Sequence, residues 1–201
     1  KVKNTWANSH CLMIPEKVAQ YFVLVSDLTD NLYKNYLNSS FRRIADNYIC
    51  YSSEKMNRFD VVISKENHIS EIIKLQEFDF TKDHNISKYS LEREFPIAEQ
   101  NRFATLTGIK GFFKSVLFTD EQNKKYMLDT GGGEVTKQLA VSDCWKHTYL
   151  PLPEQVSLNG QKSVLFSLER EPSSSLLSYS WRLRDHQALD LTGGFVSEII
   201  K

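Results

Sequence analysis

The sequence has no excess of charge of either sign and no long apolar run. Lysine plus arginine and aspartate plus glutamate balance at 25 each among 201 residues, so no long-range field attracts nucleic acid or an anionic membrane. No apolar segment approaches the roughly 20 residues needed to span a bilayer, and no N-terminal stretch has the pattern of a signal peptide. We therefore expect a cytoplasmic protein that has neither nucleic acid nor a membrane as its partner.

Cysteine is scarce and histidine is scattered. Cys11, Cys50 and Cys144 are odd in number and widely spaced, which argues against a disulfide framework and for a reducing compartment. Neither the cysteines nor the histidines have the spacing of a zinc site, so we expect no metal. The chain begins with Lys1 rather than Met, which we interpret as a sign of a fragment or of a processed chain.

A glycine-rich phosphate loop is also lacking. The run Gly131–Gly133 does not have the spacing of a dinucleotide-binding loop or of a P-loop, and no helical pattern follows it. The sequence instead predicts a hairpin turn at this position. We therefore expect no cofactor bound by this chain.

The first part of the chain predicts one strand and one helix. Residues Val18–Val25 are rich in β-branched and aromatic side chains, as a buried strand is. Beyond them, apolar residues recur at spacings of three and four as far as Tyr48, which indicates an amphipathic helix or two short ones broken near Asn38–Ser40. Its apolar stripe comprises Leu28, Leu32, Tyr36, Leu37, Phe41 and Ile44.

After Arg58 the pattern changes to short strands, separated by polar or Gly-, Asn- and Pro-containing turns at intervals of about 8–15 residues. The predicted strands are Phe59–Ser64, Ile72–Phe80, Tyr89–Phe95, Phe103–Ile109, Phe112–Phe118, Tyr126–Asp129, Lys146–Leu150, Ser163–Leu168, Leu177–Leu183 and Phe195–Ile200. A single helical turn is expected at Lys65–Ile69. The fold class is mainly β, a barrel or distorted sandwich with a short helical arm inserted after the first strand.

Paired carboxylates and a thiol beside an imidazole are the candidate chemical groups. Glu92 and Glu94 would share one face of a strand, where a solvated polar face is the favoured interpretation over acid–base chemistry. In the segment Asp143–His147, a strand would place Cys144 and His147 on opposite sides, so a nucleophilic couple is not favoured. A half-buried Trp145 in a barrel wall is the alternative.

Several of these segments, in this order, resemble the C-terminal β-barrel of the protein arginine methyltransferases. Met13–Tyr21 resembles that family's junction between domains, and the helix Leu28–Tyr48 has the position of its dimerisation arm. Phe59–Val62 and Ile73–Phe80 resemble its next barrel strands. Asp143, Cys144 and Trp145 take the place of the family's Thr-His-Trp loop, with Trp kept.

The resemblance implies a division of the chain and a candidate cleft. Residues 1–17 would join a missing upstream domain, and residues 18–201 would form the barrel, with the arm at about 28–50. The arm's apolar stripe would pack on a second subunit in a homodimer or on the missing domain, or else on the chain's own barrel. Asp143, Cys144 and Trp145 would line the substrate cleft, and Cys in place of His implies a divergent substrate or an inactive relative.

The resemblance also implies what lies elsewhere. In this family the S-adenosylmethionine site and the two glutamates that hold the substrate guanidinium belong to the upstream domain. We therefore expect no catalytic residue in this chain and no activity of the chain alone. Its full-length parent would be an S-adenosylmethionine-dependent methyltransferase acting on a protein or peptide.

An alternative is a stand-alone, non-enzymatic barrel or sandwich that binds protein or carbohydrate. Exposed aromatic side chains on its strands would then form the binding surface. The candidates are Tyr126, Tyr149, Tyr179 and Trp181.

Overall fold

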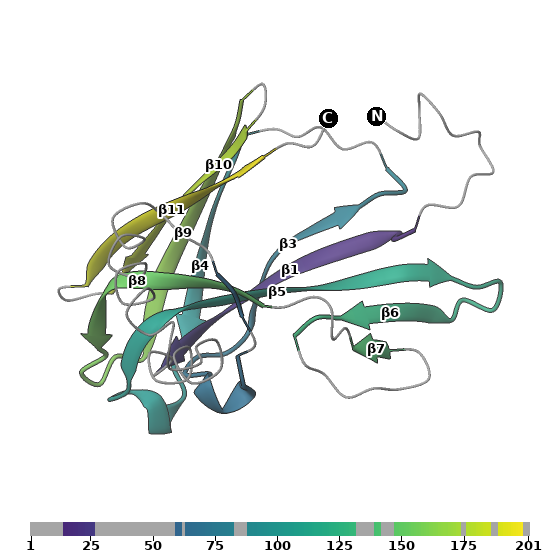
Figure 1. Ribbon diagram of the computed structural model, residues 1–201. Coiled ribbons are helices and arrows are strands. Elements are labelled where there is room, and N and C mark those ends of the chain that lie inside the picture. The colour runs from purple at the N-terminus through teal and green to yellow at the C-terminus, as the bar shows by residue number, and fades with distance from the viewer. Residues whose placement is uncertain are drawn as a thin grey trace, which may run out of the picture.

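The computed structural model describes residues 14–26, 59–61, 63–82, 88–131, 139–141, 147–173, 176–185 and 189–198. Strands account for most of them (Figure 1). The elements are β1 (Lys17–Ser26), β2 (Phe59–Val61), η1 (Lys65–Asn67), β3 (Ile73–Asp79), β4 (Tyr89–Pro96), η2 (Glu99–Asn101), β5 (Thr105–Thr119), β6 (Lys125–Asp129), β7 (Leu139–Val141), β8 (His147–Ser157), β9 (Ser163–Pro172), β10 (Leu176–Arg184) and β11 (Asp190–Glu198). The predicted helical arm lies outside the described residues. Within them, no helix is long and apolar enough to cross a bilayer.

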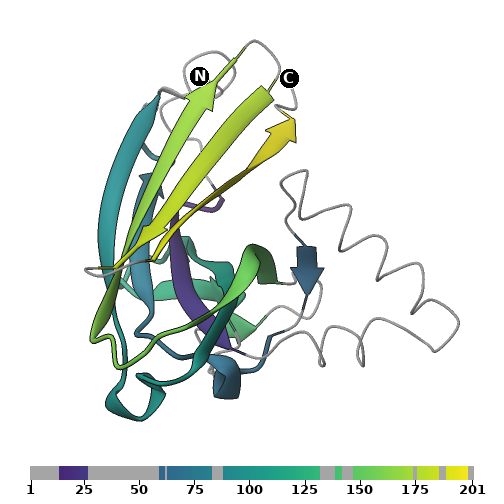
Figure 2. The same cartoon turned by 90° about the vertical axis from the view of Figure 1, so that its left-hand side faces the viewer.

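The strands form two sheets that lie as two layers (Figures 1 and 2). The large sheet has the order β2-β8-β5-β1-β3, and β6 extends it from β5 and β7 from β6. The small sheet has the order β11-β10-β9-β4. Strand pairs are antiparallel except β6 with β7. The prediction of a mainly β, barrel-like sandwich is confirmed.

Strand β5 is the organising strand of the large sheet. It pairs with β1 along one edge, and with β8 and then β6 along the other. The sequence predicted two strands here, and this prediction is wrong, because Gly108 and Gly111 lie inside one continuous strand. They are needed for close approach: a Cβ on Gly108 would lie 2.1 Å from the Tyr149 ring, and one on Gly111 would lie 2.8 Å from the Phe22 ring.

The main core lies between the two sheets. Leu24, Ile109 and Leu150 from the large sheet pack with Phe166 and other buried residues of the small sheet. Phe166 presents its ring edge-on to the rings of Phe22 and Phe95, at centroid distances of 5.6 Å and 5.7 Å. Each such buried side chain contributes about 1.5–3 kcal/mol of transfer free energy, and this burial holds the two layers together.

The other face of the large sheet carries a second, smaller cluster of buried residues. It consists of Val23, Val25, Ile63, Phe112 and Tyr149. Because successive side chains of a strand point to opposite faces, β1 sends Leu24 into the main core and its two valine neighbours into the second cluster. A strand buried on both faces accounts for the unbroken apolar run in the sequence. This second cluster borders the candidate site described below.

Besides β5, the strands β7, β8 and β11 differ from the sequence prediction. β8 continues past its predicted end at Leu150 as far as Ser157. β11 begins at Asp190, ahead of the predicted Phe195, because Gly193 lies within the strand rather than in a turn. A Cβ on Gly193 would lie 2.3 Å from the ring of Trp181, so glycine is what allows β11 to pass that indole. β7 was not predicted.

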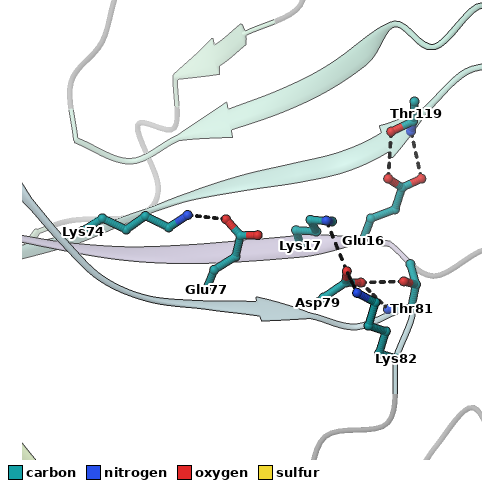
Figure 3. Close-up of polar contacts among 8 residues, drawn as sticks. All are labelled: Glu16, Lys17, Lys74, Glu77, Asp79, Thr81, Lys82 and Thr119. Atoms are coloured by element: carbon teal, nitrogen blue, oxygen red, sulfur yellow. Dashed lines mark hydrogen bonds and ion pairs between the residues drawn. The ribbon is translucent and has the colours of Figure 1, made fainter. Parts of the chain in front are cut away.

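Polar contacts fasten β1 to both of its neighbours where the described chain begins (Figure 3). The Glu16 carboxylate accepts hydrogen bonds from the backbone N–H and the hydroxyl of Thr119, at 2.9 Å and 2.8 Å. The Asp79 carboxylate pairs with Lys17 at 3.2 Å and accepts a hydrogen bond from the backbone N–H of Thr81 at 3.1 Å. These contacts fix the register of β1 against β3 and β5.

Candidate functional site

A fully buried lysine is the most unusual residue of the described chain. Lys110 lies in the middle of β5, and its exposed fraction is 0%. Because Ile109 belongs to the main core, Lys110 points to the opposite face of the sheet, toward the second cluster. Its Nζ lies 5.5 Å from the centre of the Phe112 ring. A buried ammonium is costly unless its donors are satisfied, so the partners of Lys110 decide what it does.

Those partners come from two other segments. Lys110 Nζ donates to the Ile63 carbonyl at 3.0 Å and to the Gly131 carbonyl at 3.5 Å, and it lies 3.2 Å from Nε2 of His68. An ammonium group has three donors, and here three acceptors face it. His68 must therefore present an unprotonated Nε2.

His147, the first residue of β8, completes the cluster. Its Nδ1 accepts a hydrogen bond from the backbone N–H of Ile63 at 2.9 Å, and the Thr130 backbone also hydrogen-bonds to it. The Ile63 residue is thus held at both of its backbone polar groups, the N–H by His147 and the carbonyl by Lys110. Both histidines act as neutral rings.

The electrostatics of the cluster favour this neutral form. Burial, followed by the charge of Lys110, lowers the pKa of His68 and that of His147 to about 4. Burial and the charge of Lys65 lower the pKa of Lys110 to about 8, against the opposing effect of Asp129. At neutral pH the lysine is therefore mostly charged and both histidines are neutral, which is the combination that the contacts require.

The turn after β6 is the third wall of the cluster. Asp129 is buried, pairs with Lys114 at 2.9 Å and accepts from the backbone N–H of Gly131 at 2.6 Å. A Cβ on Gly131 would lie 2.5 Å from the Phe112 ring, so glycine is required for close approach. Gly132 and Gly133, the rest of the predicted hairpin turn, lie outside the described residues.

The predicted cleft residues are neighbours of this cluster in sequence. Asp143, Cys144 and Trp145 lie outside the described residues, and so do Leu28, Leu32, Tyr36, Leu37, Phe41 and Ile44 of the arm's stripe. His147 follows Trp145 by two positions. The sequence singled out His147 only as a partner for Cys144 and missed its role at Ile63.

Lys110 and His68 were not predicted as site residues at all. The available signal was a lysine inside the otherwise apolar and glycine-containing strand segment Leu106–Phe113. In the part of the chain that is described, no group of three histidine, cysteine, aspartate or glutamate side chains could hold a metal ion.

Three other residues that the sequence analysis named, Glu92, Tyr149 and Trp181, have structural roles. The Glu92 carboxylate pairs with the Arg184 guanidinium, with 2.7 Å between Oε2 and Nη2. Both side chains are exposed, so this is a surface ion pair. Tyr149 and Trp181, named for the binding surface of the alternative non-enzymatic module, are core residues with exposed fractions of 3% and 4% and do not form such a surface. Tyr149 fills the space above Gly108, and Trp181 that above Gly193.

The fold of this chain is similar to that of several solved structures over 92–98% of its length. The sequence matches no protein-family profile and no curated protein sequence. The Trypanosoma brucei PRMT1 enzyme–prozyme heterotetrameric complex with AdoHcy matches with a TM-score of 0.67 at 12% identity, over 98% of this chain and 62% of that one. Arabidopsis thaliana protein arginine methyltransferase 10 matches with a TM-score of 0.64 at 9% identity, over 96% of this chain and 63% of that one. PRMT6 matches with a TM-score of 0.53 at 13% identity, over 92% and 55%.

The chain has the fold of the arginine methyltransferase barrel. It spans less than two thirds of the length of each of these structures.

Proposed function

We propose that this chain is the substrate-side and dimerisation barrel of an S-adenosylmethionine-dependent methyltransferase that resembles the protein arginine methyltransferases. The supporting observation is the shared fold, which extends over 98% of this chain but 62% of the Trypanosoma brucei structure. The S-adenosylmethionine-binding catalytic domain would lie outside these 201 residues. The chain by itself would then be inactive and bind no cofactor, and its full-length parent would work in the cytoplasm.

The barrel's contribution would be positional. Methyl transfer to nitrogen depends chiefly on orientation and on electrostatic complementarity to the reacting groups. In this proposal Asp143, Cys144 and Trp145 line one wall of the cleft, with Trp145 as an apolar surface for the methyl acceptor, a protein or peptide. Because Cys144 and Asp143 replace the His and Thr of the family loop, the acceptor differs from an ordinary arginine substrate or the parent is inactive.

The helical stripe from Leu28 to Ile44 would form the contact with a second subunit. The Trypanosoma brucei relative is a heterotetramer, which supports oligomerisation as a property of proteins with this barrel. We propose a homodimer in which the stripe covers the upstream domain of the partner copy. Packing on the chain's own barrel is the other outcome that the stripe allows.

Calorimetric titration with S-adenosylmethionine, on this chain and on the full-length parent side by side, tests the proposal. Binding by the parent and none by the chain is the expected result, and Trp145→Ala in the parent should then raise the KM for the acceptor. If the parent does not bind the cofactor, the similarity reduces to shared architecture and the methyltransferase proposal fails.

Sedimentation velocity tests the arm separately. Leu32→Asp and Phe41→Asp should convert a dimeric parent into a monomer whose melting temperature is unchanged. A monomeric wild-type parent, or variants that lose stability without a change in mass, would place the stripe on the chain's own barrel.

A further inference from the structure

We infer that Lys110 is a positioning residue that locks the β2–β3 connection and the turn after β6 to the start of β8, and that protonation of the neighbouring histidines opens this lock. The lock itself stands on the contacts of the described residues. Its consequence for the methyl acceptor rests on the proposed function, because the last of the predicted cleft residues, Trp145, lies two positions before His147 in the sequence.

The lock consists of hydrogen bonds that meet at the backbone of Ile63. His147 holds the N–H of Ile63 at 2.9 Å, while Lys110 holds the Ile63 carbonyl at 3.0 Å and reaches the Gly131 carbonyl at 3.5 Å. Ile63 and His68 lie in the β2–β3 connection, Gly131 follows β6 and His147 begins β8. Among the described residues, β2 pairs with β8 over three positions, Phe59 with Tyr149, Asp60 with Thr148 and Val61 with His147. A short strand pair of this kind depends on side-chain contacts for its position.

Removing the Lys110 ammonium group would take a hydrogen-bond donor away from two backbone carbonyls. The Ile63 carbonyl and the Gly131 carbonyl would lose a charge-assisted hydrogen bond, which is stronger than a neutral one. Main-chain groups left unsatisfied in a buried place are destabilising. Because both carbonyls belong to connections and not to the middle of a strand, the expected result is a local opening there rather than global unfolding.

Protons reach the lock through its two acceptors. A proton on Nε2 of His68 removes the acceptor that faces Lys110 and places two cations 3.2 Å apart. A proton on Nδ1 of His147 removes the acceptor for the N–H of Ile63. The described charged groups that face the cluster are Lys65 from η1 and Asp129 from β6, and Lys114 pairs with Asp129. Asp129 is the one acid among these described groups, and it already pairs with Lys114. A proton added to either histidine is therefore repelled by the positive charges of the nearby lysines.

Amide hydrogen exchange on this chain tests the lock. Lys110→Met should lower the protection factor of the Ile63 amide about tenfold at neutral pH, while the protection of Leu168 in the small sheet stays unchanged. Lys125→Met is the control, since it removes an exposed lysine at the start of β6, four positions before Asp129. An unchanged Ile63 protection factor in a folded Lys110→Met chain would overturn the inference.

The histidines give a second readout that a merely structural lysine would not move. In the wild-type chain the Ile63 protection factor, corrected for intrinsic exchange, should fall between pH 7 and pH 5 toward the Lys110→Met value. The double variant His68→Gln and His147→Gln keeps an acceptor at each position but cannot bind a proton, so its protection factor should not change over this range. Retention of the full acid response in the double variant would also overturn the inference, and it serves as the test if Lys110→Met does not fold.

The link to function is tested in the full-length parent. Lys110→Met should raise the KM for a peptide acceptor several-fold with little change in kcat, because the residue positions a wall and does not touch the reacting atoms. A parent that does not bind S-adenosylmethionine contradicts the proposed function, whereas the exchange experiments on this chain continue to decide the lock.

Discussion

Gly108 shows how a single residue type sets the packing of the large sheet. The ring of Tyr149 occupies the space where a side chain of residue 108 would lie, and the Tyr149 hydroxyl donates to the Thr107 carbonyl at 3.0 Å. The ring and its hydroxyl together fix β8 against β5. A residue larger than glycine at position 108 must displace that ring.

Gly108→Ala should therefore destabilise the fold by about 1–3 kcal/mol, the usual cost of overpacking. Urea unfolding of the single variant, of Tyr149→Leu and of the double variant measures this cost. Because the smaller side chain at 149 relieves the clash, the double variant should be less destabilised than the sum of the two single variants. Strict additivity would show that the ring and the added methyl group do not meet.

The two neutral histidines make stability dependent on acid. Their pKa values of about 4 in the folded chain lie below the ordinary value of 6.5, so the unfolded chain takes up protons first as pH falls. Their contribution is complete above about pH 6.5 and is lost as pH falls from there to about 4, a loss on the order of a few kcal/mol for the pair. Urea unfolding at pH 7.5 and pH 5 measures it.

The control for this dependence is the double variant His68→Gln and His147→Gln. It should lose much less stability than the wild-type chain between the two pH values, with only the carboxylates left to titrate. Equal losses in the two proteins would assign the acid sensitivity to other groups.

At the scale of an element, two acidic residues of β3, Asp79 and Glu77, differ in how much they contribute to holding the strand in its sheet. Asp79 has a side-chain exposed fraction of 13% and contacts Lys17 of β1 and the backbone of Thr81, whereas Glu77 on the same strand is 40% exposed and pairs with Lys74 (Figure 3). The side-chain hydrogen bond from Thr81 is the largest of the contacts that hold the pKa of Asp79 far below its usual range. The contacts of Asp79 join two strands, and those of Glu77 stay within one.

Asp79→Asn should lower the free energy of unfolding by about 1–2 kcal/mol, since it weakens hydrogen bonds to a charged acceptor. Glu77→Gln is the matched control on the same strand, and an exposed pair contributes about 0–1 kcal/mol. Guanidinium unfolding of both variants compares them. A loss as large for Glu77→Gln as for Asp79→Asn would mean that the joining of β1 to β3 is not what matters.

Most strands could be predicted from the sequence, because alternation and β-branched residues mark them directly. β1, β3, β4, β6 and β10 lie within a few residues of their predicted places. The errors at β5 and β11 share one cause, since Gly108, Gly111 and Gly193 look like turn residues in sequence but serve close ring packing inside strands. Which ring crosses which glycine is a tertiary contact that no local pattern contains.

The candidate site was much less predictable than the fold. Lys110, His68 and His147 come from three separate segments, and only the pairing of β5 with β8 and the path of the β2–β3 connection bring them together. A lysine among apolar residues of a strand marks an unusual residue but does not identify its partners. The predicted residues Asp143, Cys144 and Trp145 remain a prediction that rests on the resemblance.

At the scale of the whole molecule, the two sheets share one main core, and they should unfold as one unit. Phe166 lies at the centre of that core, and its truncation to alanine should cost about 3–5 kcal/mol. Amide exchange should then show equal losses of protection at Ile109 in the large sheet and at Leu183 in the small one. Phe103→Ala is the control, because Phe103 is 82% exposed and its loss should matter little. Selective loss in one sheet would mean two separate folding units.

The hairpin of β5 and β6 projects beyond the small sheet (Figure 1). Hydrogen bonds within its turn hold the turn in shape. The Asp120 carboxylate accepts from the backbone N–H groups of Gln122 and Lys124, at 3.0 Å and 2.8 Å, and Asn123 takes the left-handed conformation that such a tip needs. Gln122 and Asn123 are exposed. A cysteine placed at Gln122 therefore gives an attachment point for a dye or a surface tether, from which single molecules of this barrel can be observed without disturbing either sheet.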